Sequence, residues 1–261
     1  MKTATFDSNV WRRVVSPHRF PQDPAGPAIQ AIYTAIREGQ LAGFIAETVL
    51  TLEAVKRAVR RDFLDEYTPS VDVVERPGSP GLTFGVQIGP DSSAWPGMHP
   101  MLLQHFSDAL SLGMQVLRAP RIGGIVNPEI DPNCYVKESP EDATQRQERT
   151  FEAMRRIEAR GAGIATVQRL MAVVAPGQVW HTALSRVPES QIQRFADAIA
   201  EWADGDAVAA HIGYGCDYFV TEDKAESAGS AATLAPGNRS WLSADFGVQF
   251  VTTRELAAQL T

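Results

Sequence analysis

Short apolar runs alternate with amphipathic segments along most of this chain, and this alternation constrains its fold more than any other feature. Between the runs, apolar residues recur at helical spacing, as Ile29, Ile32 and Ile36 do within residues 28–38. Strands that alternate with helices favour a mostly parallel sheet flanked by helices. The predicted strands are residues 5–7, 41–46, 114–118, 218–220 and 248–251.

Several helices follow from the same spacing. Thr48 is a plausible N-cap for a long helix over residues 48–66, whose apolar stripe is Leu52, Val55, Val59 and Phe63. An alternating run at residues 82–88 predicts a strand or one arm of a hairpin. The other predicted helices cover residues 28–38, 100–112, 140–160, 164–174, 190–204, 206–212 and 253–260.

Bulk composition narrows the class of protein. The chain has 261 residues, of which 44% are hydrophobic and 21% charged, so it can bury a sizeable core. No apolar run is long enough to cross a membrane, and the N-terminus lacks a signal-peptide pattern, so we expect a cytoplasmic protein without membrane contact. Cys134 and Cys216 lie too far apart in sequence for a disulfide framework, and neither has a zinc-ligand neighbour. A net charge of −7 argues against a nucleic-acid coating protein, but it allows an enzyme that acts on nucleic acid.

Acidic residues follow the first strand and the strand at residues 218–220. Asp7 and Asp223 stand there, and the carboxyl ends of parallel strands line the ligand crevice of such a sheet. Taken singly, Asp206 could cap a helix, Glu53 could be a solvated charge, and Asp223 could be a turn residue.

Taken together, these acids favour a cation site. Carboxylates crowded into one crevice raise each other's pKa, and a hard divalent cation relieves that repulsion. The sequence therefore predicts that Asp7, Asp223 and further acids bind a divalent metal.

A family resemblance makes this prediction specific. Residues 6–11 (Phe-Asp-Ser-Asn-Val-Trp) resemble the opening motif of PIN-domain nucleases, and residues 216–224 resemble the family's fourth motif, Asp-Tyr-hydrophobic-hydrophobic-Thr-x-Asp. Residues 44–53 are similar to the second motif, in which a strand leads into a helix with an essential acid. Residues 206–210 resemble the third motif, and residues 246–256 match the usual last strand and helix.

The resemblance implies a PIN-like three-layer α/β/α fold with a mostly parallel central sheet and large insertions. Residues 1–261 would form a single domain. Its core would cover roughly residues 1–66, 99–119 and 200–261, and the insertions roughly residues 67–98 and 120–190.

The resemblance also implies a metal-dependent endoribonuclease. Asp7, Glu53, Asp206 and Asp223 would hold Mg²⁺ or Mn²⁺, and the ions would activate water for attack on phosphorus. Ser8, Asn9 and Thr221 would hydrogen-bond a carboxylate or the water, although Asn9 could equally cap a turn and Thr221 could simply suit a strand end. Glu47 competes with Glu53 for the role of second acid.

Partners and alternative functions follow from the same resemblance. The expected substrate is RNA, and the family includes toxins of toxin–antitoxin pairs, so an antitoxin-like protein and a second copy of the chain are candidate partners. Arg12 and Arg57 are among the cations that could line an RNA path, although exposed helix charges are more often solvated surface. The alternative is a catalytically inactive PIN-like module that binds RNA or protein. A phosphatase with an aspartyl nucleophile would need a second Asp where Asn9 stands.

Overall fold

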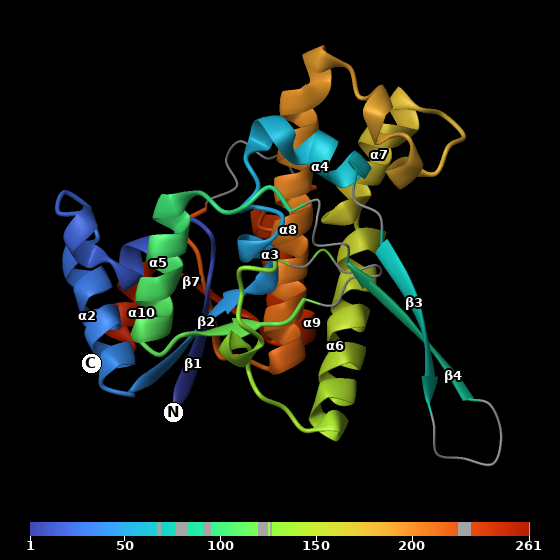
Figure 1. Ribbon diagram of the computed structural model, residues 1–261. Helices are drawn as coiled ribbons and strands as arrows, with labels where there is room; N and C mark the ends of the chain where they lie inside the picture. The colour runs from blue at the N-terminus through green and yellow to red at the C-terminus, as the bar shows by residue number, and fades with distance from the viewer. Residues whose placement is uncertain are drawn as a thin grey trace.

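Five parallel strands form the centre of the computed structural model (Figure 1). The structure describes residues 1–66, 69–76, 83–90, 95–119, 125, 127–223 and 231–260. The strand order is β5-β2-β1-β6-β7, and every neighbouring pair is parallel. This confirms the predicted α/β class and the parallel sheet. The strands are β1 Lys2–Phe6, β2 Leu41–Ala46, β5 Gln115–Leu117, β6 Tyr218–Val220 and β7 Gln249–Val251.

Helices cover both faces of this sheet, as expected for a three-layer α/β/α fold. One face carries α1 Trp11–Val15, α2 Gly26–Arg37, α5 Pro100–Ser111 and α10 Thr253–Ala258. The other face carries α3 Glu47–Leu50, α8 Ile192–Tyr214 and α9 Pro236–Phe246, with α6 Pro140–Ala159 packed on α8 (Figure 1). The short 3₁₀ turns are Pro17–Arg19, Arg57–Val59, Pro132–Cys134, Trp180–Thr182, Leu184–Arg186 and Glu189–Gln191.

Strand β1 sits in the middle of the sheet because its side chains tolerate burial on both sides. Phe6 is fully buried and pairs with Ile45 on one side and with Val220 on the other. The polar Thr5 is also buried, and its Oγ1 lies 3.0 Å from Nδ1 of His211 in α8. Burial lowers the pKa of His211 to about 3, so the imidazole is neutral and serves the core.

A second apolar cluster lies beyond the carboxyl edge of the sheet. It joins α4 Arg60–Glu66, α7 Ile164–Val174 and the first half of α8, and it forms the upper part of the molecule in Figure 1. Its buried members include Leu52, Phe63, Val167, Leu170, Phe195 and Ile199. We call this part the cap. Because α8 runs through both the cap and the main core, one rigid helix connects them.

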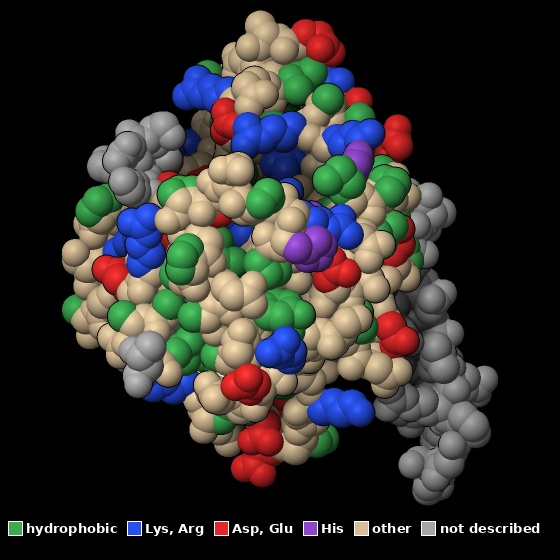
Figure 2. Space-filling model, turned by 90° about the vertical axis from the view of Figure 1, so that its left-hand side faces the viewer, with side chains coloured by type: hydrophobic (Ala, Val, Ile, Leu, Met, Phe, Trp, Pro, Cys, Tyr) green, Lys and Arg blue, Asp and Glu red, His purple; other side chains and the backbone are tan. Residues whose placement is uncertain are grey.

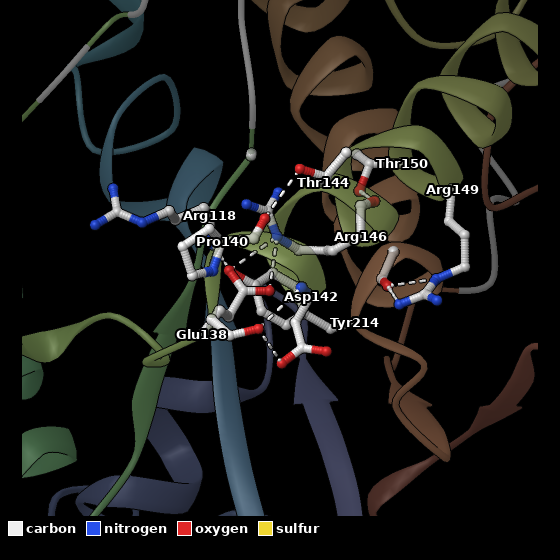
Figure 3. A network of polar contacts seen from close by, with 12 residues as sticks. Arg118, Glu138, Pro140, Asp142, Thr144, Arg146, Arg149, Thr150 and Tyr214 are labelled. Atoms are coloured by element: carbon white, nitrogen blue, oxygen red, sulfur yellow. Dashed lines mark hydrogen bonds and ion pairs between the residues drawn. The ribbon is translucent and has the colours of Figure 1, made fainter.

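Helix α6 is fastened to α8 by close packing and by a polar network (Figure 3). A Cβ on Gly213 would lie 2.0 Å from Oγ1 of Thr150, so only glycine allows the two helices to approach this closely. Nε of Arg146 donates to both carboxylate oxygens of Glu138, at 3.0 and 3.1 Å. The hydroxyl of Tyr214 donates to the same carboxylate at 3.2 Å. Residues from the predicted insertion 120–190 are therefore integral to the helical layer.

Two helix predictions were wrong. Residues 48–66 do not form one helix, because α3 ends at Leu50 and α4 begins at Arg60. Side chains from elsewhere bind the carbonyls of the intervening turn: Asn127 donates to Leu50 O at 2.7 Å, and Arg60 donates to Glu53 O at 3.1 Å. Conversely, the predicted helices 190–204 and 206–212 are one continuous helix, α8.

Other elements agree with the sequence or add to it. Helices α2, α5, α6, α7 and α10 lie close to their predicted ranges, whereas α1 and α9 were not predicted. Strands β3 Pro69–Arg76 and β4 Thr83–Pro90 pair as an antiparallel ribbon apart from the main sheet, which fits the predicted hairpin arm. Among the described helices, none has both the length and the apolarity to cross a bilayer. Both cysteines are free thiols.

Candidate functional site: an acidic cluster at the switch point of the sheet

The chain reverses its winding direction between β1 and β6. From β1 the sheet grows through β2 to β5 with α2 and α5 on one face, and it then continues on the other side of β1 through β6 to β7. In open α/β sheets, ligands bind at this point, outside the carboxyl ends of the strands. Asp7 directly follows β1, and Thr221 and Asp223 follow β6, so these predicted residues stand at the switch point.

Asp7 is held tightly in this position. Its backbone N–H donates to Val220 O at 3.0 Å, which extends the β1–β6 pairing by one residue. Its Oδ1 accepts from the N–H of Ser8 at 2.6 Å. Its Oδ2 accepts from the hydroxyl of Thr221 at 2.6 Å and from Nδ2 of Asn9 at 2.9 Å. Asn9 and Thr221 thus take the supporting positions expected from the sequence.

The loop after β6 is fixed by the same side chains. The N–H of Asp223 donates to Oγ1 of Thr221 at 3.0 Å, and the N–H of Glu222 donates to Oδ1 of Asn9 at 3.2 Å. From α9, the guanidinium of Arg239 donates to the backbone carbonyl of Asp223. Its positive charge also acts on Asp7. Arg239 is therefore a cation placed directly beside the acids.

Glu53 approaches from the turn between α3 and α4. Its Oε1 accepts from the hydroxyl of Ser8 at 3.3 Å, which brings it beside the β1 end. Glu47, the competing second acid, is engaged elsewhere. It accepts from the hydroxyl of Tyr135 at 2.7 Å and from the N–H of Ala119 at 2.9 Å, next to the end of β5. The structure therefore places Glu53, and not Glu47, beside Asp7.

The third acid requires a correction. Asp206 was predicted to begin a helix and to face the site, but it lies inside α8, and its charge acts on Glu158 of α6. The residue of α8 on which the charges of Asp7, Glu53 and Asp223 act is Asp204. Residues two apart on a helix differ by about 200° in direction, so Asp204 and Asp206 point to nearly opposite sides.

One more carboxylate, Glu201, supports this part of α8. Its Oε1 accepts from the N–H and hydroxyl of Thr233, at 2.7 and 2.6 Å, and from the N–H of Gly163 at 3.1 Å. A Cβ on Gly205 would lie 2.9 Å from Cα of Gly163, so the corner before α7 presses against the backbone of α8. These contacts beside Asp204 connect the insertion and the chain near Thr233 to α8.

The acids repel one another. Burial raises the pKa of Asp7, and the charge of Asp223 raises it further, while hydrogen bonds from Thr221 and Ser8 oppose the rise. Burial, with the charge of Asp7, raises the pKa of Glu53 to about 7. Burial raises the pKa of Asp204 well above its usual range, and the charges of Asp7, Glu53, Glu201 and Asp223 add to the rise.

This donor set fits a hard divalent cation. Asp7, Glu53, Asp204 and Asp223 offer only oxygen ligands, which Mg²⁺ and Mn²⁺ prefer, and their mutual repulsion is what a cation relieves. Within the described ranges, however, no three His, Cys, Asp or Glu side chains stand close enough to hold one ion as they are arranged. Because Asp7 is fixed by its hydrogen bonds, ion binding would require the other acidic side chains to move toward it.

Comparison with models of protein families, with curated proteins and with solved structures finds no match for this chain. Its function must be inferred from the site itself.

Sequence reasoning missed Asp204, Glu201 and Arg239. The sequence did hold a signal for Asp204. Phe195, Ile199 and Trp202 form an apolar stripe, and the next position on that stripe is 206. Asp206 therefore belongs to the packed face and Asp204 to another face. Nothing in the local sequence marks Arg239, because its helix α9 was not predicted.

Proposed function

We propose that this protein is a metal-dependent endoribonuclease of the PIN-domain type. One observation carries the proposal. Asp7, Glu53, Asp204 and Asp223 come from separate parts of the chain and converge on the switch point, where burial and neighbouring carboxylate charges raise the pKa of Asp7, Glu53 and Asp204. A fold gains no stability from such a group of acids, and perturbed carboxylates in a crevice are typical of functional sites.

These acids would hold Mg²⁺ or Mn²⁺. Held there, a divalent cation supplies a water of lowered pKa and offsets negative charge on a phosphodiester. The residues of the chain contribute orientation and charge. Thr221 and Asn9 fix the carboxylate of Asp7 and favour its ionised form, because they donate to it. Arg239 and the loop after β6 fix the backbone of Asp223.

Two features support RNA as the substrate. The motifs at residues 6–11 and 216–224 resemble those of PIN-domain nucleases. In addition, the positive charges of Arg12 and Arg60 act on Glu53, and that of Arg239 acts on Asp7, despite the net charge of −7. Arg60 is buried, whereas Arg12 is exposed and can contact a phosphate of a polyanionic substrate. A toxin role and an antitoxin partner stay predictions from the resemblance.

A non-catalytic PIN-like module that binds RNA or protein is the second candidate. It is favoured by one observation, namely that the acidic side chains among the described residues do not close around a common ion.

The test is cleavage of single-stranded RNA by the wild type and by Asp7→Asn, each with and without Mn²⁺ or Mg²⁺. We expect cleavage internal to the strand that requires the divalent ion and is lost in the variant. Circular dichroism of the variant controls for folding. Retained RNA binding without cleavage by the wild type in either metal would favour the second candidate.

A further inference from the structure

A cavity of about 560 Å³ opens on the face of the sheet that carries α1, α2 and α5. It lies between the end of α1, the 3₁₀ turn Pro17–Arg19, α2 and the end of α5. Its walls combine the aromatic rings of Phe20 and Tyr33 with apolar side chains, and its polar lining groups are His18, Gln30, Arg37, Asp108 and Ser111. Nothing in the proposed hydrolytic chemistry uses this cavity.

The aromatic walls are already held in place. The ring of Phe20 stacks on that of the buried His105, with centroids 6.0 Å apart and planes inclined by 24°. The guanidinium of Arg37 lies 5.7 Å from the centroid of Tyr33. The ring of Phe20, held against a buried side chain, loses little freedom when a flat base stacks on it.

The charge around the cavity suits a phosphate backbone. His18 and Arg37 line it, and Arg19 lies beside it. The lining carboxylate, Asp108, is occupied: it accepts from Ser16 at 2.6 Å and from Gln104 at 3.1 Å, and it lies 3.8 Å from Arg19. Burial lowers the pKa of His105, and the charges of Arg19, Arg12 and His18 lower it further against the opposing charge of Asp108.

The cavity is connected to the acidic cluster through α1. Asp7 lies four residues before this helix, and Val15, its last residue, lines the cavity, so the five-residue helix, about 7.5 Å long, leads from one site to the other. The charge of Arg12, in the same helix, acts both on Glu53 and on His105. In Figure 2, which views this side of the molecule, Lys and Arg side chains surround a hollow between the upper part and the main body.

We infer that this cavity is a subsite for one nucleotide of a single-stranded RNA, with the base between Phe20 and Tyr33 and the neighbouring phosphates beside Arg12 and Arg37. The inference rests on the proposed nuclease function and deepens it. Only an unpaired base presents both faces for stacking, so the subsite selects single strands over duplexes.

Binding is measured in the Asp7→Asn background without divalent ions, so that no turnover is needed. The probe is a short fluorescein-labelled single-stranded RNA of mixed sequence, followed by anisotropy. We expect Tyr33→Ala to weaken binding by about fivefold or more, the usual effect of losing one stacked base. Tyr33→Phe should bind within about twofold of the parent, because the ring remains.

Matched controls lie on α6, on the other side of the sheet. Phe151→Ala removes an aromatic ring that is 41% exposed, and Arg155→Gln removes a cation that is 73% exposed. Both should leave affinity unchanged. Arg37→Gln should weaken binding and lower the salt dependence by about one phosphate contact. It also keeps the test decisive if Tyr33→Ala fails to fold.

The inference would be overturned if Tyr33→Ala bound RNA as tightly as Phe151→Ala, or if Arg37→Gln bound it as tightly as Arg155→Gln. The cavity would then belong to a different ligand, such as a protein segment. The nuclease proposal fails separately. If binding depends on Tyr33 but no RNA is cleaved, the subsite is supported and the nuclease proposal is not. If RNA is cleaved and KM is unaffected by Tyr33→Ala, the nuclease proposal is supported and the subsite is not.

Discussion

The two halves of the acidic cluster are built differently. On the strand side, the carboxylate of Asp7 accepts hydrogen bonds from Ser8, Asn9 and Thr221, and its backbone continues the sheet. On the cap side, the hydrogen bond that a described residue donates to the carboxylate of Glu53 is a long one of 3.3 Å from Ser8. For Asp204, burial and neighbouring charges raise the pKa, and no hydrogen bond from a described residue opposes the rise. One half is organised in advance by hydrogen bonds, and the other, which we call the loose half, is not.

This difference shows how a fold can keep an unfavourable site. The sheet fixes the position of Asp7, because strand pairing and the loop after β6 leave it little freedom. Glu53 and Asp204 lie under repulsion, because burial and the neighbouring carboxylate charges raise their pKa. A cation would draw them toward the fixed half.

The largest predicted effect is a difference in RNA cleavage between variants at Asp204 and at Asp206. Asp204→Asn should reduce metal-dependent RNA cleavage by at least about 100-fold, because it removes a member of the cluster. Asp206→Asn changes the same charge two residues away, on the opposite side of α8, and should retain most activity. Rates under single-turnover conditions measure both. Equal losses in two folded variants would show that the assignment to Asp204 is wrong.

The next effect tests the organised half. Thr221→Val removes the 2.6 Å hydrogen bond to Asp7 while keeping the shape of the side chain, and it should lower the cleavage rate by about 10- to 100-fold. Thr221→Ser keeps the hydroxyl and should restore most of the rate. If serine rescues nothing, the hydroxyl does not position Asp7, and the contrast between the two halves is lost.

Removing one charge from the cluster should lower activity but raise the thermal stability of the metal-free protein. Glu53→Gln removes a charge that raises the pKa of Asp204 and keeps an oxygen for the Ser8 hydroxyl, so the metal-free variant should melt about 2–4 °C above the metal-free wild type, as expected for roughly 1 kcal/mol in a chain of this size. Saturating Mn²⁺ should stabilise the wild type and leave the variant nearly unchanged. Differential scanning calorimetry measures both effects. A lower melting temperature for the variant would contradict a repulsive cluster.

The smallest effect is a pH dependence of the metal-free protein. In the folded state the pKa of Glu53 is raised from 4.5 to about 7, so in this window the folded chain binds a proton that the unfolded chain has lost. Stability from this group is therefore full below pH 4.5 and falls as the pH rises through 7, by about 1–3 kcal/mol. Urea unfolding at pH 5 and pH 8 tests it. The slope should flatten in Asp7→Asn, and an unchanged slope would remove Asp7 as a cause.

The sequence predicted the organised half better than the loose half for a physical reason. Strand ends are marked by local pattern, so Asp7 and Asp223 could be placed at the sheet edge, and the parallel sheet followed from the alternation of elements. Glu53 was identified, but in the wrong local structure, because contacts from Asn127 and Arg60 replace the predicted helix by a turn.

Asp204 was missed because a helix boundary was predicted between Asp204 and Asp206, where Gly205 stands. The helix continues through Gly205, where a side chain would collide with the backbone of Gly163, so this glycine serves tertiary packing and does not mark a boundary. Asp206 consequently moved from the site to the packed face toward Glu158. Local propensity carries no information about such an approach of two backbones.

The contact between Gly163 and Gly205 has a consequence for any remodelling of this protein. Because the corner before α7 rests directly on the helix turn that presents Asp204, trimming the insertion would uncover that turn and remove the hydrogen bond from Gly163 to Glu201. The insertion therefore packs against the helix that carries part of the acidic cluster. Neither can be shortened or moved to another protein without redesigning the other.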